Sequence, residues 1–271
     1  MAKLTKAEAK AHASAIELLA KDSLTEDDCE FVFRNWNEGA NHVNGAAGAF
    51  FTPYDMAFDF AFDVGGTRII DLCAGIGMLS YAVFYRAKWG HFERAADVTC
   101  IERNPDYIAV GKKLLPEATW ICADVLDVLD MDLGHFDYAI SNPPFGNIKR
   151  TRNAPRYTGK DFEFHVIDIA AHLADYGVFI VPQMSAGFKY SGQRNYSRDT
   201  EGKAVKFQQM IDAEFHAGCG VDTAFYRDAW KGVSPLCEIV CVDFTEDRER
   251  PAVTPTAAND NAPLDLFGAA A

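Results

Sequence analysis

Residues 68–88 read RIIDLCAGIGMLSYAVFYRAK, and this stretch decides the expected fold. Its first part, Arg68–Cys73, is a short apolar run typical of a buried strand. Gly75 and Gly77 follow as a Gly-x-Gly turn, in which the backbone can bend sharply and a ligand can approach it closely. Met78–Lys88 has the pattern of a helix. We therefore predict a strand, a tight turn and a helix, in that order.

The alternation of strand and helix continues toward the C-terminus. Further strands are expected at Val98–Glu102, Thr119–Ala123, Phe136–Ser141 and Val178–Pro182, and helices at Pro105–Leu115, Phe162–Asp175 and Ala204–His216. Val221–Phe225 and Cys237–Phe244 are expected to close the sheet as a hairpin-like pair. Near-continuous apolar strands separated by helices indicate a parallel sheet covered on both faces. The predicted fold class is α/β, a Rossmann-like, doubly wound, mostly parallel seven-stranded sheet.

Two helices are expected ahead of this sheet. One covers residues 3–20, and the other follows Thr25, which with Asp28 forms an N-cap signature, and runs to about residue 37. Residues 38–49 have the composition of a loop, and Thr52 is expected to cap a third helix with Pro53 at its first position. We predict a helical extension over residues 1–49, a catalytic domain over 50–245 and a disordered tail over 246–271.

Charge and composition narrow the classes of protein. The chain has 271 residues and a net charge of −13, which argues against a general nucleic-acid coat protein, since such binding relies on Lys and Arg at the phosphates. No apolar run approaches the ~20 residues of a membrane span, and the N-terminus lacks a signal-peptide core, so a cytoplasmic protein is expected. The seven cysteines include no Cys-x-x-Cys pair, so free thiols and no metal site are expected.

Four groups of residues fall at the carboxyl ends of predicted strands, where doubly wound sheets bind ligands. They are residues 71–77, Glu102, Asp124 and the tetrapeptide Asn142-Pro143-Pro144-Phe145. The Glu102 carboxylate could accept from two ribose hydroxyls, and Asp124 could accept from an exocyclic adenine amine. A dinucleotide fingerprint would need glycine at position 80, where the chain has Ser80, so a nicotinamide-dependent oxidoreductase is disfavoured.

These residues resemble the motifs of class I S-adenosylmethionine-dependent methyltransferases. That family carries Asp-x-x-x-Gly-x-Gly after its first strand, an acid after the second and often Asp after the third. Asp71, Gly75, Gly77, Glu102 and Asp124 match this pattern in order and spacing, within a resemblance that covers about residues 50–183. The resemblance implies S-adenosylmethionine as cofactor. The residues expected to bind it are Phe51, Thr52, Pro53, Asp71, Cys73, Gly75, Gly77, Glu102, Arg103, Asp124, Val125 and Asn142.

The tetrapeptide at 142–145 has the chemistry needed to methylate an aromatic amine. The nitrogen lone pair of such an amine must be aimed at the methyl group, and hydrogen-bond acceptors around the NH₂ can hold it there and stabilise the developing positive charge. Asn142 offers its side-chain carbonyl and Pro143 its backbone carbonyl. Pro143 and Pro144 place no competing N–H there and stiffen the loop. Phe145 offers a ring on which a flipped base can stack. All four are expected to be catalytic.

This tetrapeptide resembles the motif of amino-methyltransferases that act on adenine N6, guanine N2, cytosine N4 or protein glutamine. Phe51-Thr52-Pro53 also resembles a segment of adenine-N6 DNA methyltransferases of the restriction-modification type, where it packs against the methionine part of the cofactor. Methylation of adenine N6 in DNA is therefore the leading hypothesis. RNA adenine-N6 or guanine-N2 methylation, protein-glutamine methylation and a non-catalytic nucleotide-binding module are the alternatives.

Two runs of basic residues interleaved with tyrosine are expected at the same edge of the sheet, in spite of the negative net charge. The residues expected to bind nucleic acid there are Lys149, Arg150, Arg152, Arg156, Lys189 and Arg194. Little of the chain remains for a target-recognition region, so sequence selectivity is expected to be short or to come from a partner.

One short peptide in the expected tail suggests a protein partner. Leu264-Asp265-Leu266-Phe267 resembles the peptide with which bacterial replication proteins bind the sliding clamp, with Pro263 in place of its glutamine. The resemblance implies contact with a clamp through these four residues.

Overall fold

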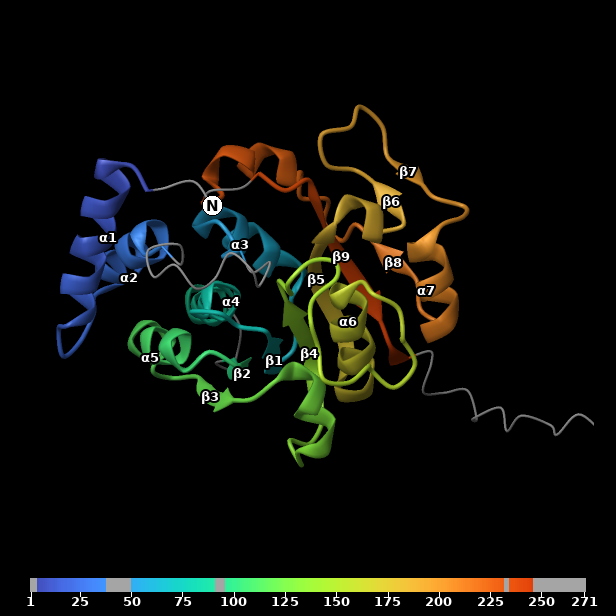
Figure 1. Cartoon of the computed structure of the whole chain (residues 1–271), viewed down its shortest axis with the longest axis horizontal. Helices are drawn as coiled ribbons and strands as arrows, with labels where there is room; N and C mark the ends of the chain where they lie inside the picture. The colour runs from blue at the N-terminus through green and yellow to red at the C-terminus, as the bar shows by residue number, and fades with distance from the viewer. Residues whose placement is uncertain (1–3, 38–49, 91–95, 232–233, 246–271) are drawn as a thin grey trace, which may run out of the picture.

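The structure, a computed structural model of the whole chain, describes residues 4–37, 50–90, 96–231 and 234–245. The expected loop at 38–49 and the expected tail, with its Leu264–Phe267 peptide, lie outside the described residues. Figure 1 shows a central sheet with helices packed against both faces. Among the described residues, no helix combines the length and the hydrophobicity that crossing a membrane requires.

The main sheet has seven strands in the order β3-β2-β1-β4-β5-β9-β8. The strands are β1 (Arg68–Leu72), β2 (Asp97–Glu102), β3 (Thr119–Cys122), β4 (Phe136–Ser141), β5 (Ala174–Pro182), β8 (Phe215–His216) and β9 (Cys237–Asp243). The first five are parallel, and β9 is antiparallel to β5 and β8. The predicted seven-stranded, mostly parallel sheet is confirmed. Its order reverses between β1 and β4, the position at which such sheets bind ligands. A separate ribbon joins β6 (Phe188–Lys189) to β7 (Ser197–Arg198).

The helices divide the interior into two cores, one on each face of the sheet. The first core holds α3 (Tyr54–Phe60), α4 (Met78–Trp89) and α5 (Pro105–Leu114), and the second holds α6 (Phe162–Leu173) and α7 (Lys203–Ile211). Because successive side chains of a strand point to opposite faces, β5 sends Val178 into the first core and Phe179 into the second. Four short 3₁₀ segments complete the described fold: η3 (Ala61–Asp63), η4 (Val125–Asp130), η5 (Gln183–Ser185) and η6 (Thr223–Ala229).

The N-terminal helices belong to the first core. α1 (Lys6–Leu19) and α2 (Glu26–Asn35) each begin with a capping box, and that of α2 pairs Thr25 with Asp28 as predicted. At the end of α2, the ring of Trp36 lies 5.6 Å from that of Phe51 and 5.8 Å from that of Tyr107. Phe51 and Tyr107 line the pocket described below, so the N-terminal helices support one of its walls.

Three expected helix boundaries were wrong, and the first two concern α3 and α6. α3 begins at Tyr54 with Pro53 at its N-cap position, and within the described residues no side chain caps it. Thr52 is not a cap, because its hydroxyl accepts a hydrogen bond from Asn142 instead. The helix expected to reach Asp175 ends at Leu173, since pairing with both β4 and β9 keeps the following residues in a strand.

The C-terminal part of the sheet also differs from expectation. The helix expected over 204–216 ends at Ile211, and Asp212 adopts a left-handed conformation that turns the chain into β8. The strand expected at 221–225 is wrong, because the Asp222 side chain accepts from the N–H of Ala224 and starts the 3₁₀ segment η6. The antiparallel partner of β9 at that edge is therefore β8.

Candidate active site

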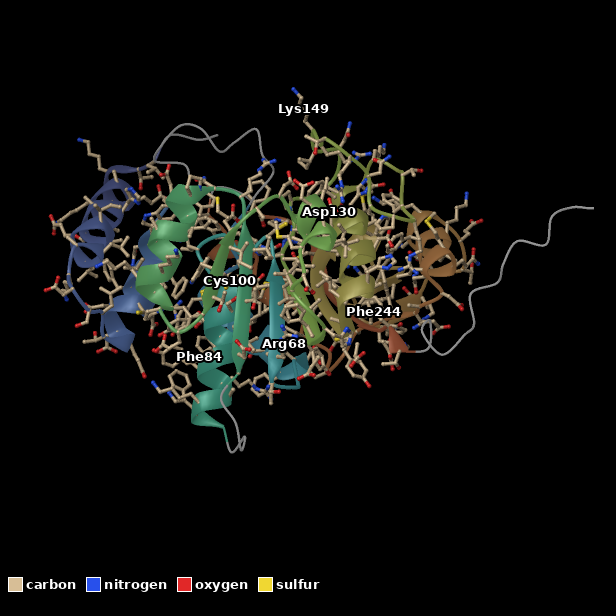
Figure 2. All side chains as sticks on the ribbon, turned by 90° about the horizontal axis from the view of Figure 1, so that it is seen from below. Arg68, Phe84, Cys100, Asp130, Lys149 and Phe244 are labelled. Atoms are coloured by element: carbon tan, nitrogen blue, oxygen red, sulfur yellow. The ribbon has the colours of Figure 1, made fainter. Side chains whose placement is uncertain are left out.

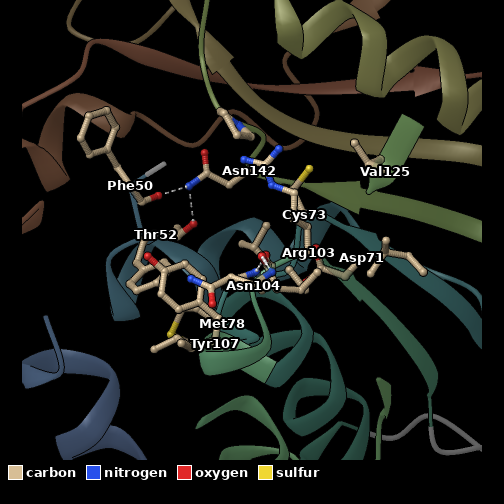
Figure 3. Close-up of a pocket in the computed structure, with 18 of the residues that line it drawn as sticks. Phe50, Thr52, Asp71, Cys73, Met78, Arg103, Asn104, Tyr107, Val125 and Asn142 are labelled. Carbon is tan, nitrogen blue, oxygen red and sulfur yellow. Dashed lines mark hydrogen bonds between the residues drawn. The ribbon is translucent and has the colours of Figure 1, made fainter. Parts of the chain in front are cut away.

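A pocket of about 320 Å³ lies at the carboxyl ends of β1 to β4 (Figure 3). Its walls come from the turn after β1, the residues after β2 and β3, the segment before α3, and the tetrapeptide after β4. The lining residues are Phe50, Phe51, Thr52, Asp71, Cys73, Ala74, Gly75, Ile76, Met78, Leu79, Ile101, Glu102, Arg103, Asn104, Pro105, Tyr107, Ala123, Asp124, Val125, Asn142, Pro144, Ile148 and Phe162. Such a size and mainly apolar lining are typical of small-molecule sites.

The turn after β1 is built tightly against the segment before α3. Gly75 has a φ of +59°, and a Cβ atom there would lie 2.8 Å from the Phe51 ring. Cys73 also has a positive φ, of 70°, which is uncommon for a residue with a side chain. A side chain at position 75 would therefore be strained and would displace the ring that forms one wall of the pocket.

Asp71 is a buried carboxyl group that is only half satisfied. Its Oδ2 accepts a hydrogen bond of 2.6 Å from the Ser80 hydroxyl, while its Oδ1 has no hydrogen-bond partner among the described residues. Burial raises the pKa of Asp71 to about 7. An unpaired buried acceptor in a pocket wall is suited to a ligand that brings a donor or a positive charge. Ser80, which breaks the dinucleotide fingerprint, has the role of orienting this group.

Glu102, after β2, connects two turns of the pocket. Its Oε2 accepts from the N–H of Gly75 at 2.9 Å, and its Oε1 accepts from the N–H of Asn104 at 2.7 Å. Burial raises the pKa of Glu102. Each carboxylate oxygen retains a second lone pair, so the expected acceptance from ribose hydroxyls remains available.

Asp124, after β3, lies on the neighbouring wall. Its Oδ1 accepts from the N–H of Leu126 at 3.0 Å, and its Oδ2 lies 3.7 Å from Nη1 of Arg103. The side chain thus caps η4 and also faces the pocket. The pocket therefore has three carboxyl groups, from Asp71, Glu102 and Asp124. It has one guanidinium among its lining residues, from Arg103.

The amide of Asn142 is oriented by the segment before α3 (Figure 3). Its Nδ2 donates to the backbone carbonyl of Phe50 at 2.8 Å and to the hydroxyl of Thr52 at 3.0 Å. A backbone carbonyl can only accept, so the nitrogen must be the amide atom on that side. Oδ1 therefore points away from this anchor, and among the described residues no hydrogen bond engages it. The side chain presents a carbonyl acceptor at the pocket.

The other tetrapeptide residues occupy different environments. Pro144 lines the pocket, Pro143 is buried, and Phe145 is half-buried and packs against the first core. The Phe145 ring is not among the pocket-lining side chains in this conformation. Ile148 and Phe162, which we did not expect from the sequence, do line the pocket.

Ten of the twelve residues predicted to bind a cofactor line the pocket, and the exceptions are Pro53 and Gly77. Among the residues that were missed, Asn104 caps α5 and Tyr107 lies in its first turn. The Asn-Pro pair at 104–105 is a helix-start signal, which could have indicated that this helix begins at the pocket.

The six predicted nucleic-acid contacts separate into two groups. Within the described part of the chain, Lys149, Lys189 and Arg194 are exposed and make no ion pair. Lys149 projects from the edge of the sheet that carries the pocket, opposite Arg68 at the start of β1 (Figure 2).

The other three, all arginines, are engaged within the protein. Arg150 donates to Asn153 and to the carbonyl of Gly159, Arg152 pairs with Asp130 at 2.6 Å, and Arg156 pairs at 2.7 Å with the buried Asp168. The ion pair of Arg156 with Asp168 holds the loop that contains Arg156 against α6.

Several solved structures share this fold. A protein from Listeria monocytogenes described as a class I S-adenosylmethionine-dependent methyltransferase matches with a TM-score of 0.57 at 13% identity, over 89% of this chain and 81% of its own. A type I restriction-modification methyltransferase subunit from Streptococcus thermophilus gives 0.52 at 12% identity, over 81% of this chain and 50% of its own. A modification subunit of a type I restriction enzyme from Vibrio vulnificus gives 0.54 at 10% identity, over 83% and 51%.

The chain has the class I methyltransferase fold. It spans about half of the length of the two restriction-modification subunits. No protein-family model matches the sequence, and a search of curated proteins gave no match. In the class I methyltransferase fold of this chain, the pocket lies at the carboxyl ends of the strands on either side of the order reversal.

Proposed function

We propose that the protein transfers a methyl group from S-adenosylmethionine to the exocyclic N6 amine of adenine in DNA. The observation that carries the proposal is the anchored amide of Asn142. Within the described residues, both hydrogen bonds of this amide are made by Nδ2, so the carbonyl oxygen remains as an acceptor on a side chain that lines a pocket with three carboxyl groups.

The chemical groups that line the pocket match those of S-adenosylmethionine. The cofactor carries an ammonium and a sulfonium, and the unpaired Oδ1 of Asp71 offers a buried acceptor for the ammonium. Glu102 would hold the ribose hydroxyls, and Asp124 would hold the adenine amine. A dinucleotide would bring phosphates close to these three carboxyl groups, where like charges repel. When bound, S-adenosylmethionine supplies an electrophilic methyl group.

The residues after β4 would then act on the second substrate. The Oδ1 of Asn142 and the carbonyl of Pro143 accept from the two N–H groups of the target amine, which aims the nitrogen lone pair and stabilises the charge that develops on it. The nitrogen forms a bond to the methyl carbon as the carbon–sulfur bond breaks toward sulfur, and the nitrogen afterwards loses a proton to solvent. The site needs no strong general base, because the methylated amine is acidic.

DNA is favoured as the polymer by two observations. Two of the structures with the same fold are named as a methyltransferase subunit of a type I restriction-modification system and a modification subunit of a type I restriction enzyme, and restriction systems act on DNA. Phe50 and Thr52, in the segment that resembles adenine-N6 DNA methyltransferases, hold the amide of Asn142. Lys149, Lys189 and Arg194 supply exposed positive charge for phosphates.

The residues from 264 to 267 are proposed to add a sliding-clamp contact, which deletion of residues 262–271 should abolish.

The function can be tested without knowing the target sequence. The protein is incubated with methyl-labelled S-adenosylmethionine and separate pools of DNA, RNA and protein, and each pool is digested and analysed by mass spectrometry. We expect label in DNA, as N6-methyldeoxyadenosine. Label in RNA would reassign the polymer, label in glutamine would reassign the substrate class, and no label in any pool would contradict the proposal.

A further inference from the structure

A buried carboxylate lies beside residues 142–146, the proposed catalytic loop, without lining the pocket. Glu163 is in the first turn of α6 and is fully buried. Burying an ionised carboxylate is costly unless hydrogen bonds and a positive charge compensate it. The groups that bind the Glu163 carboxylate therefore show which parts of the chain it connects.

The two oxygens of Glu163 bind two different loops. Oε2 accepts from the backbone N–H of Gly146 at 2.8 Å, and Oε1 accepts from the hydroxyl of Ser185 at 2.7 Å. Gly146 directly follows Phe145, and Ser185 lies in η5 after β5. Nζ of Lys203, at the start of α7, lies 3.8 Å from Oε1 and 2.7 Å from Asp161, and supplies the positive charge.

Gly146 is held from both sides. Its N–H donates to Glu163, and its carbonyl accepts from the N–H of Phe162 at 2.8 Å. Its φ of +77° is strained for any residue with a side chain, so the turn depends on glycine and on these two bonds. The catalytic loop is thus fixed at one end by Asn142 on Phe50 and Thr52, and at the other end by Gly146 on α6.

Such a loop has to be placed accurately to be useful. Acceptors that aim a lone pair must lie within about 0.5 Å of their productive positions, and a displacement of about 1 Å can cost about 10²-fold in rate. Without the Glu163 bond, the backbone N–H of Gly146 would lose its partner, and Gly146 would be held only through its carbonyl, so the C-terminal end of the loop could shift.

We propose that Glu163 is a positioning residue for methyl transfer. It fixes the turn at Gly146, and with it Asn142 to Phe145, and through Ser185 it joins the catalytic loop to the loop after β5. This assignment rests on the function proposed above. Glu163 touches neither the pocket nor the target, so its removal acts on the rate of transfer and leaves cofactor binding in place.

The test compares Glu163→Ala, Glu163→Gln and Glu163→Asp with the wild type. Alanine removes both hydrogen bonds, and aspartate keeps the charge but is too short to reach Gly146. Glutamine can accept from Gly146 through its oxygen and donate to Ser185 through its nitrogen. We expect kcat to fall about 10²-fold in Glu163→Ala and at least about tenfold in Glu163→Asp, and to recover to within about tenfold of wild type in Glu163→Gln. Affinity for S-adenosylhomocysteine should change less than about threefold.

Hydrogen exchange adds a readout that does not depend on activity. The amides of residues 142–148 should exchange faster in Glu163→Ala than in the wild type. The matched control is Asp137→Ala, which removes a carboxylate that accepts from the N–H groups of Thr67 and Arg68 at the opposite edge of the sheet. It should leave exchange at 142–148 and kcat unchanged.

The outcomes separate the two proposals. A wild-type protein that transfers no label contradicts the proposed function, whatever Glu163 does. An active wild type whose Glu163→Asp variant folds and keeps kcat within twofold, or loses kcat and cofactor affinity by equal factors, contradicts the positioning role. Exchange at 142–148 that is unchanged in Glu163→Ala also contradicts it.

Discussion

The two halves of the sheet are held together in different ways. In the half formed by β1, β2 and β3, the carboxyl groups of the pocket bind residues at most 27 positions away: Asp71 binds Ser80 nine positions on, and Glu102 binds Asn104 two positions on and Gly75 27 positions back. In the half formed by β4, β5 and β9, the longest contacts reach further along the chain. Asn142 reaches Phe50 across 92 positions, and Glu238 binds Ser191 across 47.

This difference indicates a division of labour. The first half lines the proposed cofactor pocket with backbone turns and the acids within them. The second half fixes loops through buried carboxylates. Glu163 holds the proposed catalytic loop, Asp168 holds the loop around Arg156, and Glu238 accepts from Gln183, Tyr190 and Ser191. Changes in the first half should alter cofactor affinity, and changes in the second half should alter transfer or polynucleotide binding.

The largest expected effect is in the second half, at Asn142. Replacing Asn142 with Ala removes the acceptor that holds the target amine, so kcat should fall roughly 10²–10³-fold. Affinity for S-adenosylhomocysteine should remain within about threefold. Single-turnover transfer and calorimetry on the same preparation measure the two quantities, and a parallel loss of both would remove the distinction between the halves.

The exposed cations of the second half should give the next largest effect. In the triple variant Lys149→Ala, Lys189→Ala and Arg194→Ala, DNA affinity should fall roughly 30-fold at low salt. The slope of log affinity against log salt should become shallower by about 3, because three phosphate contacts are lost. Fluorescence anisotropy across a salt series gives both numbers. Arg152→Ala is the matched control and should have a small effect, because this cation already pairs with Asp130. An unchanged slope in the triple variant would mean that DNA binds elsewhere.

Gly75 tests the first half alone. In Gly75→Ala, a φ of +59° costs about 1–2 kcal/mol and the new Cβ displaces Phe51, so the Kd for S-adenosylhomocysteine should rise roughly tenfold. DNA binding should be unaffected. Gly202→Ala also introduces a side chain at a positive φ, but in open space and away from the pocket, and it should leave cofactor binding unchanged. If DNA affinity fell together with cofactor affinity, the two halves would not be separable.

The last expected effect is a pH dependence at Asp71, which is gradual because it follows the titration of a single group. Burial raises the pKa of Asp71 to about 7, and a cationic ligand favours the ionised form. Cofactor binding should therefore weaken as pH falls below about 7, by up to tenfold per pH unit, and Asp71→Asn should bind more weakly with no such dependence.

The apoprotein should show the opposite trend in stability. Because the folded state keeps the Asp71 proton that the unfolded state loses above its ordinary pKa of 3.8, the free energy of unfolding should decrease as pH rises from about 4 to 7. Calorimetric titrations and thermal melts between pH 5.5 and 7.5 check both statements. If cofactor affinity of the wild type did not change with pH, the ammonium of the cofactor would bind elsewhere in the pocket.

The sequence predicted the first half well, because its structure depends on local signals. A continuous apolar strand, a Gly-x-Gly turn and an acid at a strand end are each visible within a few residues, and β1, β2 and β3 lie within one residue of expectation. Ten of the twelve predicted cofactor residues line one pocket because parallel strand ends meet at one edge of the sheet.

The second half was predicted less well, because its contacts are set by the folded chain. Glu163 is an ordinary acid in a helical pattern until folding places Gly146 and Ser185 against it. Arg152 and Arg156 belonged to a basic run in the sequence, and only the fold shows that acids engage them. The wrong strand at 221–225 has the same cause. We expected residues 221–225 to pair with β9, but in the folded chain β8 is the strand that pairs there.

Calorimetry with S-adenosylhomocysteine and with NAD tests the central claim most directly, because the proposed methyl transfer depends on the chemistry of this pocket. The measurement needs neither the target sequence nor the polymer. We predict that S-adenosylhomocysteine binds with one site per chain and that NAD gives no heat of binding. Binding of NAD, or no binding of S-adenosylhomocysteine, would contradict it.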